Sequence, residues 1–370
     1  MLRPDTANMV RDQRIVSARP LISPALLREE LTLTVRHARR VLAGRQSVGA
    51  ILNGADDRLL VIVGPCSVHD PAAAKDYAQR LAKLAECLAD QLCVVMRVYF
   101  EKPRTTIGWK GLINDPGLDG SYDVNRGLRM ARKLLLDIVE LGLPVGCEFL
   151  DPITPQYIAD TVSWGSIGAR TAQSQVHRQL CSGLSMPVGV KNSTEGDVQA
   201  AVDAAAAAAA SHVFAGITDD GLAAILTTTG NPDCHVILRG SQAGPNYDAA
   251  NVTDATQRLA KAGQQPRLIV DASHGNSGKD HCRQPVVAAE IAGRLASGER
   301  GVVGLMLESF LSSGRQQLIL GEADRLAYGC SVTDACIDWD TTVTVLRTLA
   351  QAVDARRSGN HGTNAYGRAG

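Results

Sequence analysis

Polar and ionisable side chains stand where eight short apolar runs of this sequence end. They are Cys66, Arg97, Glu148, Arg170, Lys191, Arg239, His274 and Glu308. A single charged residue at the end of a strand is commonly no more than a solvated boundary. Eight of them indicate a shared site, because the carboxyl ends of parallel strands meet at one edge of a sheet or at one mouth of a barrel.

Six cations belong to this group or follow it closely. They are Arg97, Lys102, Arg104, Arg170, Lys191 and Arg239. Guanidinium groups bind phosphate and carboxylate oxygens through paired hydrogen bonds, and cations gathered in a partly dry mouth need anions to offset the cost of their desolvation. The residues therefore predict ligands with several negative charges. Phosphorylated, carboxylated small molecules fit this prediction better than neutral sugars or amides.

The second chemical group consists of Cys66, His274 and Glu308, joined by Asp334 in "SVTDACID". A thiolate, an imidazole and two carboxylates make a mixed soft and hard site for a divalent transition metal, whereas magnesium seldom accepts sulfur. Taken alone, Cys66 is better explained by packing, and His274 is as readily a capping or core histidine as a ligand. The prediction of a metal site therefore depends on all four side chains reaching the same end of the strands.

The elements that must position these residues are short apolar runs alternating with longer helical patterns, as in β–α units on a parallel sheet. The predicted strands are residues 58–64, 92–98, 144–150, 167–170, 187–191, 235–240, 267–272 and 301–309. Segments such as residues 71–90 and 125–142 carry apolar residues at helical spacing. This pattern predicts an α/β fold, a closed (β/α)8 TIM barrel, with a doubly wound open sheet as the alternative. Residues 212–217 predict a small β insertion near the sixth unit.

The chain is expected to have three parts. Residues 1–50 form an N-terminal extension, helical over residues 26–44, that makes oligomer or regulatory contacts. Residues 51–356 form the catalytic barrel. Residues 357–370 are glycine-rich with little to bury, and they are expected to be a flexible tail.

The composition excludes several classes of partner. Lys+Arg and Asp+Glu both number 38, so the basic excess typical of proteins that bind nucleic acid or anionic membranes is missing. The N-terminal sequence lacks a signal-peptide pattern, and no segment carries about 18 uninterrupted apolar residues. Nine cysteines, with no Cys-x-x-Cys pair, favour a reducing compartment over a disulfide framework. We therefore expect a cytoplasmic protein without nucleic-acid or membrane partners.

Several long motifs closely resemble the microbial class I 3-deoxy-D-arabino-heptulosonate 7-phosphate (DAHP) synthases. They include "LLVIVGPCSVHDP", "VMRVYFEKPRTTIGWKGLINDP", "GARTAQSQVHR", "DASHGNSGK" and "SVTDACIDW", and the similarity runs from about residue 20 to residue 356. The resemblance implies a metal-dependent (β/α)8 barrel. It also implies the first step of the shikimate pathway, in which phosphoenolpyruvate and erythrose 4-phosphate give DAHP and phosphate.

The resemblance further implies roles for individual residues. One divalent transition metal ion (Mn, Fe, Co or Zn) would be held by Cys66, His274, Glu308 and Asp334. The phosphoenolpyruvate site falls on Arg97, Lys102, Arg170, Lys191 and Arg239, with Glu148 beside it. The erythrose 4-phosphate site falls on Pro103, Arg104, Thr105 and Thr106. Lys102 is the candidate general acid for the aldehyde oxygen, with a metal-bound water or Asp334 as the alternative.

Regulation and assembly are also expected from the resemblance. Many relatives are feedback-inhibited by an aromatic amino acid, near segments that match residues 151–156, 180–185 and 214–216, and these segments look nearest to the tyrosine-sensitive type. We expect a homodimer or homotetramer.

The segment after Arg239 departs from the family pattern. After Arg239 the chain reads "GSQAGPNY" where the family usually has Gly-Gly-Lys, which puts substrate affinity there in doubt. A 3-deoxy-octulosonate 8-phosphate synthase would share the barrel and the chemistry but lack the sequence from "KPRTT" to "GWKG". A catalytically dead phosphosugar sensor would have lost a metal ligand, whereas all four predicted ligands are present in this sequence.

Overall fold

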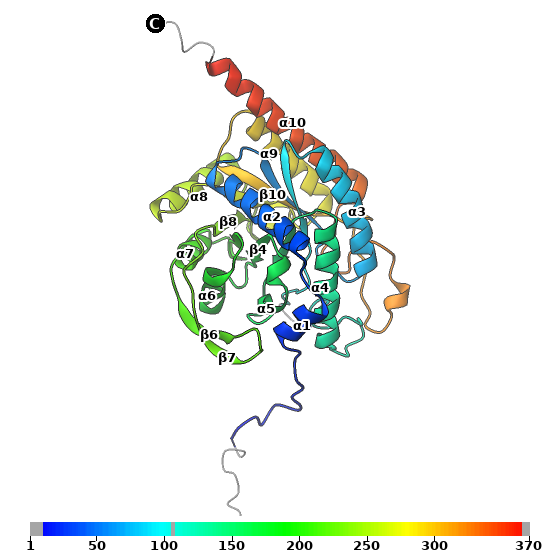
Figure 1. Ribbon diagram of the computed structural model, residues 1–370. Helices are drawn as coiled ribbons and strands as arrows, with labels where there is room; N and C mark the ends of the chain where they lie inside the picture. Colours follow the sequence, from blue (N-terminus) through cyan, green and yellow to red (C-terminus); the bar gives the residue numbers. More distant parts are fainter. Residues whose placement is uncertain (1–9, 105–107, 365–370) are drawn as a thin grey trace, which may run out of the picture.

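Eight parallel strands close into a barrel at the centre of the computed structural model, which describes residues 10–104 and 108–364 (Figure 1). The order around the barrel is β1, β2, β3, β4, β5, β8, β9 and β10, and β10 pairs with β1 to close it. The strands are β1 (Leu59–Gly64), β2 (Leu92–Arg97), β3 (Val145–Glu148), β4 (Trp164–Ile167), β5 (Val188–Lys191), β8 (His235–Leu238), β9 (Leu268–Asp271) and β10 (Val302–Glu308). The predicted TIM barrel is confirmed, and the open sheet is excluded.

Helices follow the barrel strands along the chain and surround the barrel. They are α3 (Pro71–Cys87), α4 (Val124–Glu140), α5 (Pro155–Ile158), α6 (Gln175–Gly183), α7 (Gln199–Ala208), α8 (Ala249–Lys261), α9 (Gln284–Ala296) and α10 (Trp339–Asn364). The start of α3 shows how local sequence ends a site loop: Asp70 accepts hydrogen bonds from the Ala72 and Ala73 amides, and Pro71 occupies the first helical position.

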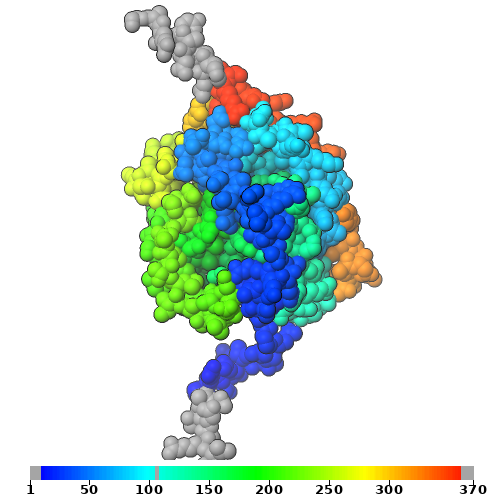
Figure 2. Space-filling model, in the orientation of Figure 1, coloured from blue at the N-terminus to red at the C-terminus, as the bar shows by residue number. Residues whose placement is uncertain are grey.

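The barrel interior is a packed core and not a pore. Apart from Val303, every residue of the eight barrel strands is buried. The interior cluster draws residues from six strands: Leu60, Ile62, Cys93, Val95, Trp164, Ile237, Ile269 and Met306. Helix α2 (Val35–Asn53) adds Val48, Ile51 and Leu52 to the same cluster and so covers the amino-terminal end of the barrel. In Figure 2 this helix lies in blue across the face shown. The open end is therefore the one where the strands finish.

The predicted fourth strand was placed three residues too late. Its prediction was residues 167–170, whereas β4 ends at Ile167. Trp164 is fully buried in the barrel interior and donates to His235 Nε2 at 3.2 Å, which fixes the strand at the earlier position. Gly168 then begins a turn, because its carbonyl accepts from the Thr171 amide. Arg170 consequently sits in a turn beyond the strand.

A two-stranded antiparallel hairpin, β6 (Val213–Ile217) and β7 (Ala223–Thr227), is inserted between α7 and β8. It confirms the predicted insertion before the sixth barrel strand. Its turn contacts α1 (Pro24–Glu30), where the Ala25 amide donates to the Asp219 carbonyl and Arg28 pairs with the Asp219 carboxylate at 2.6 Å.

The ends of the chain differ in detail from the expected pattern. The single helical stretch expected over residues 26–44 is two helices, because α1 ends at Glu30 and Thr34 begins α2 with a capping box. At the other end, α10 continues to Asn364. Within the part of the chain that the structure describes, no helix combines the length and apolar character needed to cross a membrane.

Candidate active site

A cavity of about 470 Å³ opens at the carboxyl ends of the barrel strands. Ten of the predicted site residues line it: Arg97, Lys102, Pro103, Arg104, Glu148, Arg170, Lys191, Arg239, His274 and Asp334. Cys66 and Glu308 are buried at its edge, where they contact Lys102 and Arg97. Thr105 and Thr106 lie outside the described residues. The structure thus brings the predicted cations and the predicted metal ligands to one end of the barrel.

Three of the four predicted metal ligands form a tight cluster. Cys66, Glu308 and Asp334 each offer a donor atom within 4.8 Å of the other two, and the Cys66 thiol donates to Asp334 Oδ2 at 3.8 Å. His274 stands next to this cluster, with its Nε2 4.0 Å from Glu308 Oε1. A thiolate, an imidazole and two carboxylates at such separations fit a divalent transition ion.

The thiol of Cys66 is protonated before any metal binds. Burial, with the charge of Glu308 nearby, raises the pKa of Cys66 to about 11. A sulfur ligand must lose this proton, so metal binding here releases a proton and weakens as the pH falls.

A buried carboxylate that the sequence did not reveal orients His274. Asp271 is fully buried at the end of β9, and its Oδ2 accepts from His274 Nδ1 at 2.7 Å while its Oδ1 accepts from Ser273 Oγ at 2.6 Å. Burial opposes its ionisation, yet His274 and Lys191 hold the pKa of Asp271 well below its usual range. The contact leaves Nε2 free to face the cluster, as in other carboxylate–histidine–metal arrangements. The available signal was a carboxylate ending the apolar run "RLIVD".

Buried carboxylates in and around the cavity balance the charge of the buried cations. Arg97 donates to Glu308 Oε1 at 2.9 Å and to the Pro65 carbonyl at 3.1 Å, and its guanidinium lies 3.6 Å from the centre of the Tyr99 ring. Lys191 Nζ lies 3.4 Å from Asp271 and 3.8 Å from Glu148. These pairs hold the cations in fixed positions before a substrate arrives.

The loop after β2 carries Lys102 to the metal cluster. Its Nζ donates to the Cys66 carbonyl at 3.1 Å and lies 3.2 Å from Cys66 Sγ. The Lys102 amide donates to the Lys110 carbonyl, and Arg104 Nε donates to the Trp109 carbonyl at 2.7 Å. The loop is thereby folded back on itself, with Pro103 and Arg104 facing the cavity.

The cavity lining also includes five residues with polar side chains that sequence reasoning did not single out: Thr194, Ser241, Gln242, Lys279 and Thr333. Ser241 and Gln242 belong to the segment after Arg239 that departs from the family pattern. The departure therefore changes the lining of the cavity itself.

A second cavity, of about 930 Å³, lies between the hairpin and the neighbouring helices. All three segments expected to surround an effector contribute to it: Pro152, Ile153, Pro155 and Gln156; Leu180, Leu184 and Ser185; and Phe214, Ala215 and Gly216. Its lining is mostly apolar, with Gln179, Ser185 and Thr228 among the polar residues.

Comparisons with known proteins agree with this geometry. The sequence pattern of the DAHP synthetase I family matches residues 33–347. A phospho-2-dehydro-3-deoxyheptonate aldolase of Corynebacterium glutamicum is 54% identical over 96% of this chain and 97% of its own length. The Phe-sensitive and Tyr-sensitive enzymes of Escherichia coli K12 are 54% and 49% identical, over 94% and 92% of this chain and 98% and 96% of their own. The structure of the Francisella tularensis aldolase superposes with a TM-score of 0.90 at 48% identity, covering 93% of this chain and 99% of that one.

Proposed function

We propose that this chain, which belongs to the DAHP synthetase I family, uses its strand-end cavity to hold two phosphorylated substrates beside a divalent transition metal ion. The enzyme is a 3-deoxy-7-phosphoheptulonate synthase: it condenses phosphoenolpyruvate with D-erythrose 4-phosphate and water to give DAHP and phosphate. This is the first step of the shikimate pathway, which leads to the aromatic amino acids. The observation that supports the site is the convergence of metal donors and buried cations in one cavity.

Cys66, His274, Glu308 and Asp334 would hold the metal ion. The mixture of sulfur, nitrogen and oxygen donors supports Mn, Fe, Co or Zn over magnesium. When bound, the ion supplies Lewis-acid polarisation of the aldehyde oxygen. Asp271 supports this assignment, because its bond to Nδ1 fixes the tautomer that presents Nε2 of His274 to the cluster.

The buried cations would bind phosphoenolpyruvate through its phosphate and carboxylate. Arg97 and Lys191 are already held by carboxylates, and Arg170 and Arg239 line the same cavity. Carbon 3 of phosphoenolpyruvate attacks the aldehyde carbon, and positive charge develops at carbon 2. The Glu148 carboxylate lines the same cavity, and Lys191 holds its pKa down against the effect of burial. It would stabilise that charge before water adds and phosphate leaves.

The loop after β2 would serve the second substrate. Pro103 and Arg104 line the cavity and would bind erythrose 4-phosphate at its phosphate end, together with Thr105 and Thr106. Lys102 is the proton donor that we favour for the aldehyde oxygen. Its ammonium group contacts Cys66 directly and also lines the cavity, so it lies between the metal ligands and the substrate space.

The assignment is tested by Cys66→Ala, with the buried Cys93→Ala in the barrel interior as the matched control. We expect the Cys66 variant to lose bound metal and at least about a hundredfold in activity, because a metal ligand is gone. Metal content is measured after dialysis, and activity as phosphate release from phosphoenolpyruvate with erythrose 4-phosphate, after chelation and addition of each metal. Full activity of the Cys66 variant with added manganese would remove this residue from the site.

The second cavity supports feedback inhibition by an aromatic amino acid. Its apolar lining suits an aromatic ring, and Gln179 and Ser185 offer polar groups for a phenol. We infer tyrosine as the effector, because residues 151–156, 180–185 and 214–216 look nearest to the tyrosine-sensitive type.

We also infer a homodimer or homotetramer in a reducing compartment such as the cytoplasm. Large apolar side chains are exposed on the hairpin and on the neighbouring α1, including Val213, Leu222, Ile225 and Leu26. A second copy of the chain would cover them. All nine cysteines are free thiols, which a reducing compartment preserves.

A further inference from the structure

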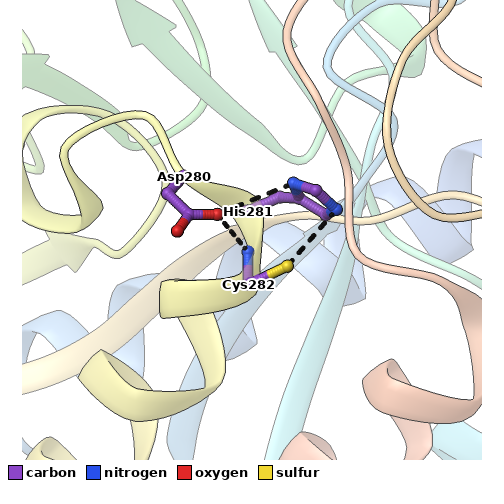
Figure 3. A group of neighbouring side chains, drawn as sticks. All are labelled: Asp280, His281 and Cys282. Carbon is purple, nitrogen blue, oxygen red and sulfur yellow. Dashed lines mark hydrogen bonds and ion pairs between the residues drawn. The ribbon is translucent and has the colours of Figure 1, made fainter.

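Asp280, His281 and Cys282 form a second group of metal-binding side chains (Figure 3). One donor atom from each residue lies within 4.8 Å of the donor atoms of the other two. None of the three lines the active-site cavity or has a part in the reaction described above. A thiol, an imidazole and a carboxylate together suit a thiophilic transition ion and do not suit magnesium or calcium.

The backbone places these three side chains together. Consecutive residues of a 3-10 turn point about 120° apart, so neighbouring positions alone do not bring donor atoms together. Here Asp280 precedes the turn η4 (His281–Arg283), and its Oδ1 accepts from the Cys282 amide at 2.9 Å. The turn leads directly into α9, which anchors it. The group is therefore held in place without a ligand.

The spacing of the sulfur and nitrogen donors already matches a bound ion. Cys282 Sγ lies 3.7 Å from His281 Nε2. A zinc ion with tetrahedral geometry and ordinary bond lengths separates its sulfur and nitrogen ligands by about 3.6 Å. Asp280 Oδ1 lies 3.9 Å from Nδ1, the other nitrogen of the ring, and Figure 3 marks this contact with a dashed line. Because Oδ1 already accepts from the Cys282 amide, Oδ2 is the carboxylate oxygen that would bind the ion.

The group is reachable from solvent and is bordered by a second segment. Asp280 and Cys282 are exposed, and His281 is partly so. Ser313, which follows β10, places its hydroxyl 3.1 Å from His281 Nε2 and adds an oxygen donor. We propose that Asp280, His281 and Cys282 bind one thiophilic divalent transition ion, of which Zn²⁺ is the representative, independently of the ion in the barrel mouth. An ion bound here would join the loop that carries His274 to the segment that follows Glu308.

The experiment measures alkylation of each cysteine by iodoacetamide in the full chain, resolved by peptide mass spectrometry. Because the alkylation rate is measured separately for each cysteine, Zn²⁺ bound at Cys66 does not affect the rate recorded for Cys282. At free Zn²⁺ about ten times the dissociation constant, alkylation of Cys282 should slow by about tenfold, while the exposed Cys87, which belongs to no donor group among the described residues, should react at an unchanged rate. Mg²⁺ at the same concentration should protect neither cysteine.

A pair of histidine variants decides whether this protection comes from the proposed site. His281→Gln should abolish the protection of Cys282, whereas His212→Gln, which belongs to no donor group among the described residues, should leave it intact. Equal protection in His281→Gln would show binding by the thiol alone and overturn the proposal. Protection of Cys87 to the same degree as Cys282, or protection of Cys282 by Mg²⁺, would overturn it as well.

Discussion

The hydrogen bond between Asp271 and His274 is the residue-level contact on which the proposed metal site most depends. Asp271→Asn keeps the size of the side chain but removes its charge. The His274 ring should then be less firmly oriented, and its Nε2 should be less basic. We expect metal affinity to fall about 10-fold to 100-fold, measured by competition with a chromogenic chelator.

The matched control for this prediction is Asp324→Asn, which removes an exposed carboxylate that does not line the active-site cavity. It should leave metal affinity unchanged. Circular dichroism should show that both variants are folded. An Asp271 variant that is folded and binds metal as tightly as the original chain would contradict the role assigned to this carboxylate.

Glu101 is a second buried carboxyl group, next in sequence to Lys102. Its oxygens accept from the Leu150 amide at 3.4 Å and from Thr154 Oγ1 at 3.3 Å, so it joins the active-site loop to the segment that lines the second cavity. Burial, together with repulsion from Asp151, raises the pKa of Glu101 to about 8. Cys147 is the other titratable group close to it.

This raised pKa makes stability depend on pH. A carboxyl group with a folded pKa near 8 binds its proton more tightly in the folded chain than in the unfolded one. Its contribution to the free energy of unfolding is therefore fully present below the unfolded pKa of about 4.5 and is lost as the pH rises towards 8. Over this range the free energy of unfolding falls by up to about 1.4 kcal/mol per pH unit. Glu101→Gln should make the free energy of unfolding less dependent on pH in this range, because an amide does not titrate and can donate to Thr154.

Denaturant unfolding of both chains from pH 5 to pH 8 measures this prediction, with the exposed Glu86→Gln as the control. The difference in free energy of unfolding between Glu101→Gln and the original chain should grow as the pH rises. If this difference were constant from pH 5 to pH 8, a group other than Glu101 would be responsible for the pH dependence of stability.

At the residue scale, the sequence was informative where a side chain follows an apolar run. Cys66, Arg97, Lys191, His274 and Glu308 were placed correctly at the barrel mouth in this way. Asp271 and Glu101 were missed, because their importance comes from partners such as His274 and Thr154 that tertiary structure brings to them. The local sequence shows that Asp271 ends an apolar run, but it does not show the contact with His274.

At the scale of single elements, the hairpin β6–β7 lines the second cavity and not the active-site cavity, so the proposed effector site is separate from the catalytic one. Phe214 of β6 lines the second cavity, whereas its neighbour Val213 is exposed and does not. If this cavity binds tyrosine, Phe214→Ala should raise the half-inhibitory concentration by about tenfold or more through the loss of an aromatic contact. The rate without inhibitor should be unchanged, because the hairpin does not line the active-site cavity.

Steady-state assays with tyrosine, phenylalanine and tryptophan added separately measure this prediction. Val213→Ala serves as the control and should be inhibited like the original chain. Inhibition by phenylalanine alone would overturn the choice of tyrosine, and full sensitivity of Phe214→Ala would place the effector outside this cavity.

The boundary of β4 shows why single elements are harder to predict than their order. "IGAR" has the apolar start of a strand, but the structure ends the strand at Ile167 and turns at Gly168. The earlier "WGS" pairs with β3 and β5 because Trp164 fills the barrel interior. That packing involves residues distant in sequence, so local pattern alone could not locate it.

For the whole molecule, the alternation of strands and helices predicted the barrel because each β–α unit repeats the same signal. Closure itself depends on the pairing of β1 with β10, which are about as far apart in the chain as two strands can be. The sequence offered no direct sign of that pairing. Assembly beyond the single chain was also only an expectation, drawn from the family resemblance and from the N-terminal extension of residues 1–50.

The apolar surface formed by α1 and the hairpin leads to a test of assembly. Leu222 is 66% exposed at the end of the hairpin turn and does not line either cavity described above. Leu222→Lys would bury a charge at the inferred interface, so we expect light scattering to report a smaller assembly at the same protein concentration. Circular dichroism should be unchanged.

The control for assembly is Val286→Lys, which adds the same charge at an exposed position of α9. It should keep the mass of the original assembly. An unchanged mass for Leu222→Lys would exclude this surface as the interface.

Strands β6 and β7 pair with each other and, among the described residues, with no strand of the barrel. We therefore expect a substitution in the hairpin to leave the pairing of the barrel strands unchanged. In evolutionary terms, a duplicated gene for such an enzyme can diverge in the effector that inhibits the enzyme, while selection keeps the catalysed reaction constant. Copies that are inhibited by different end products can arise from a few changes in one peripheral element, without passing through an inactive ancestor.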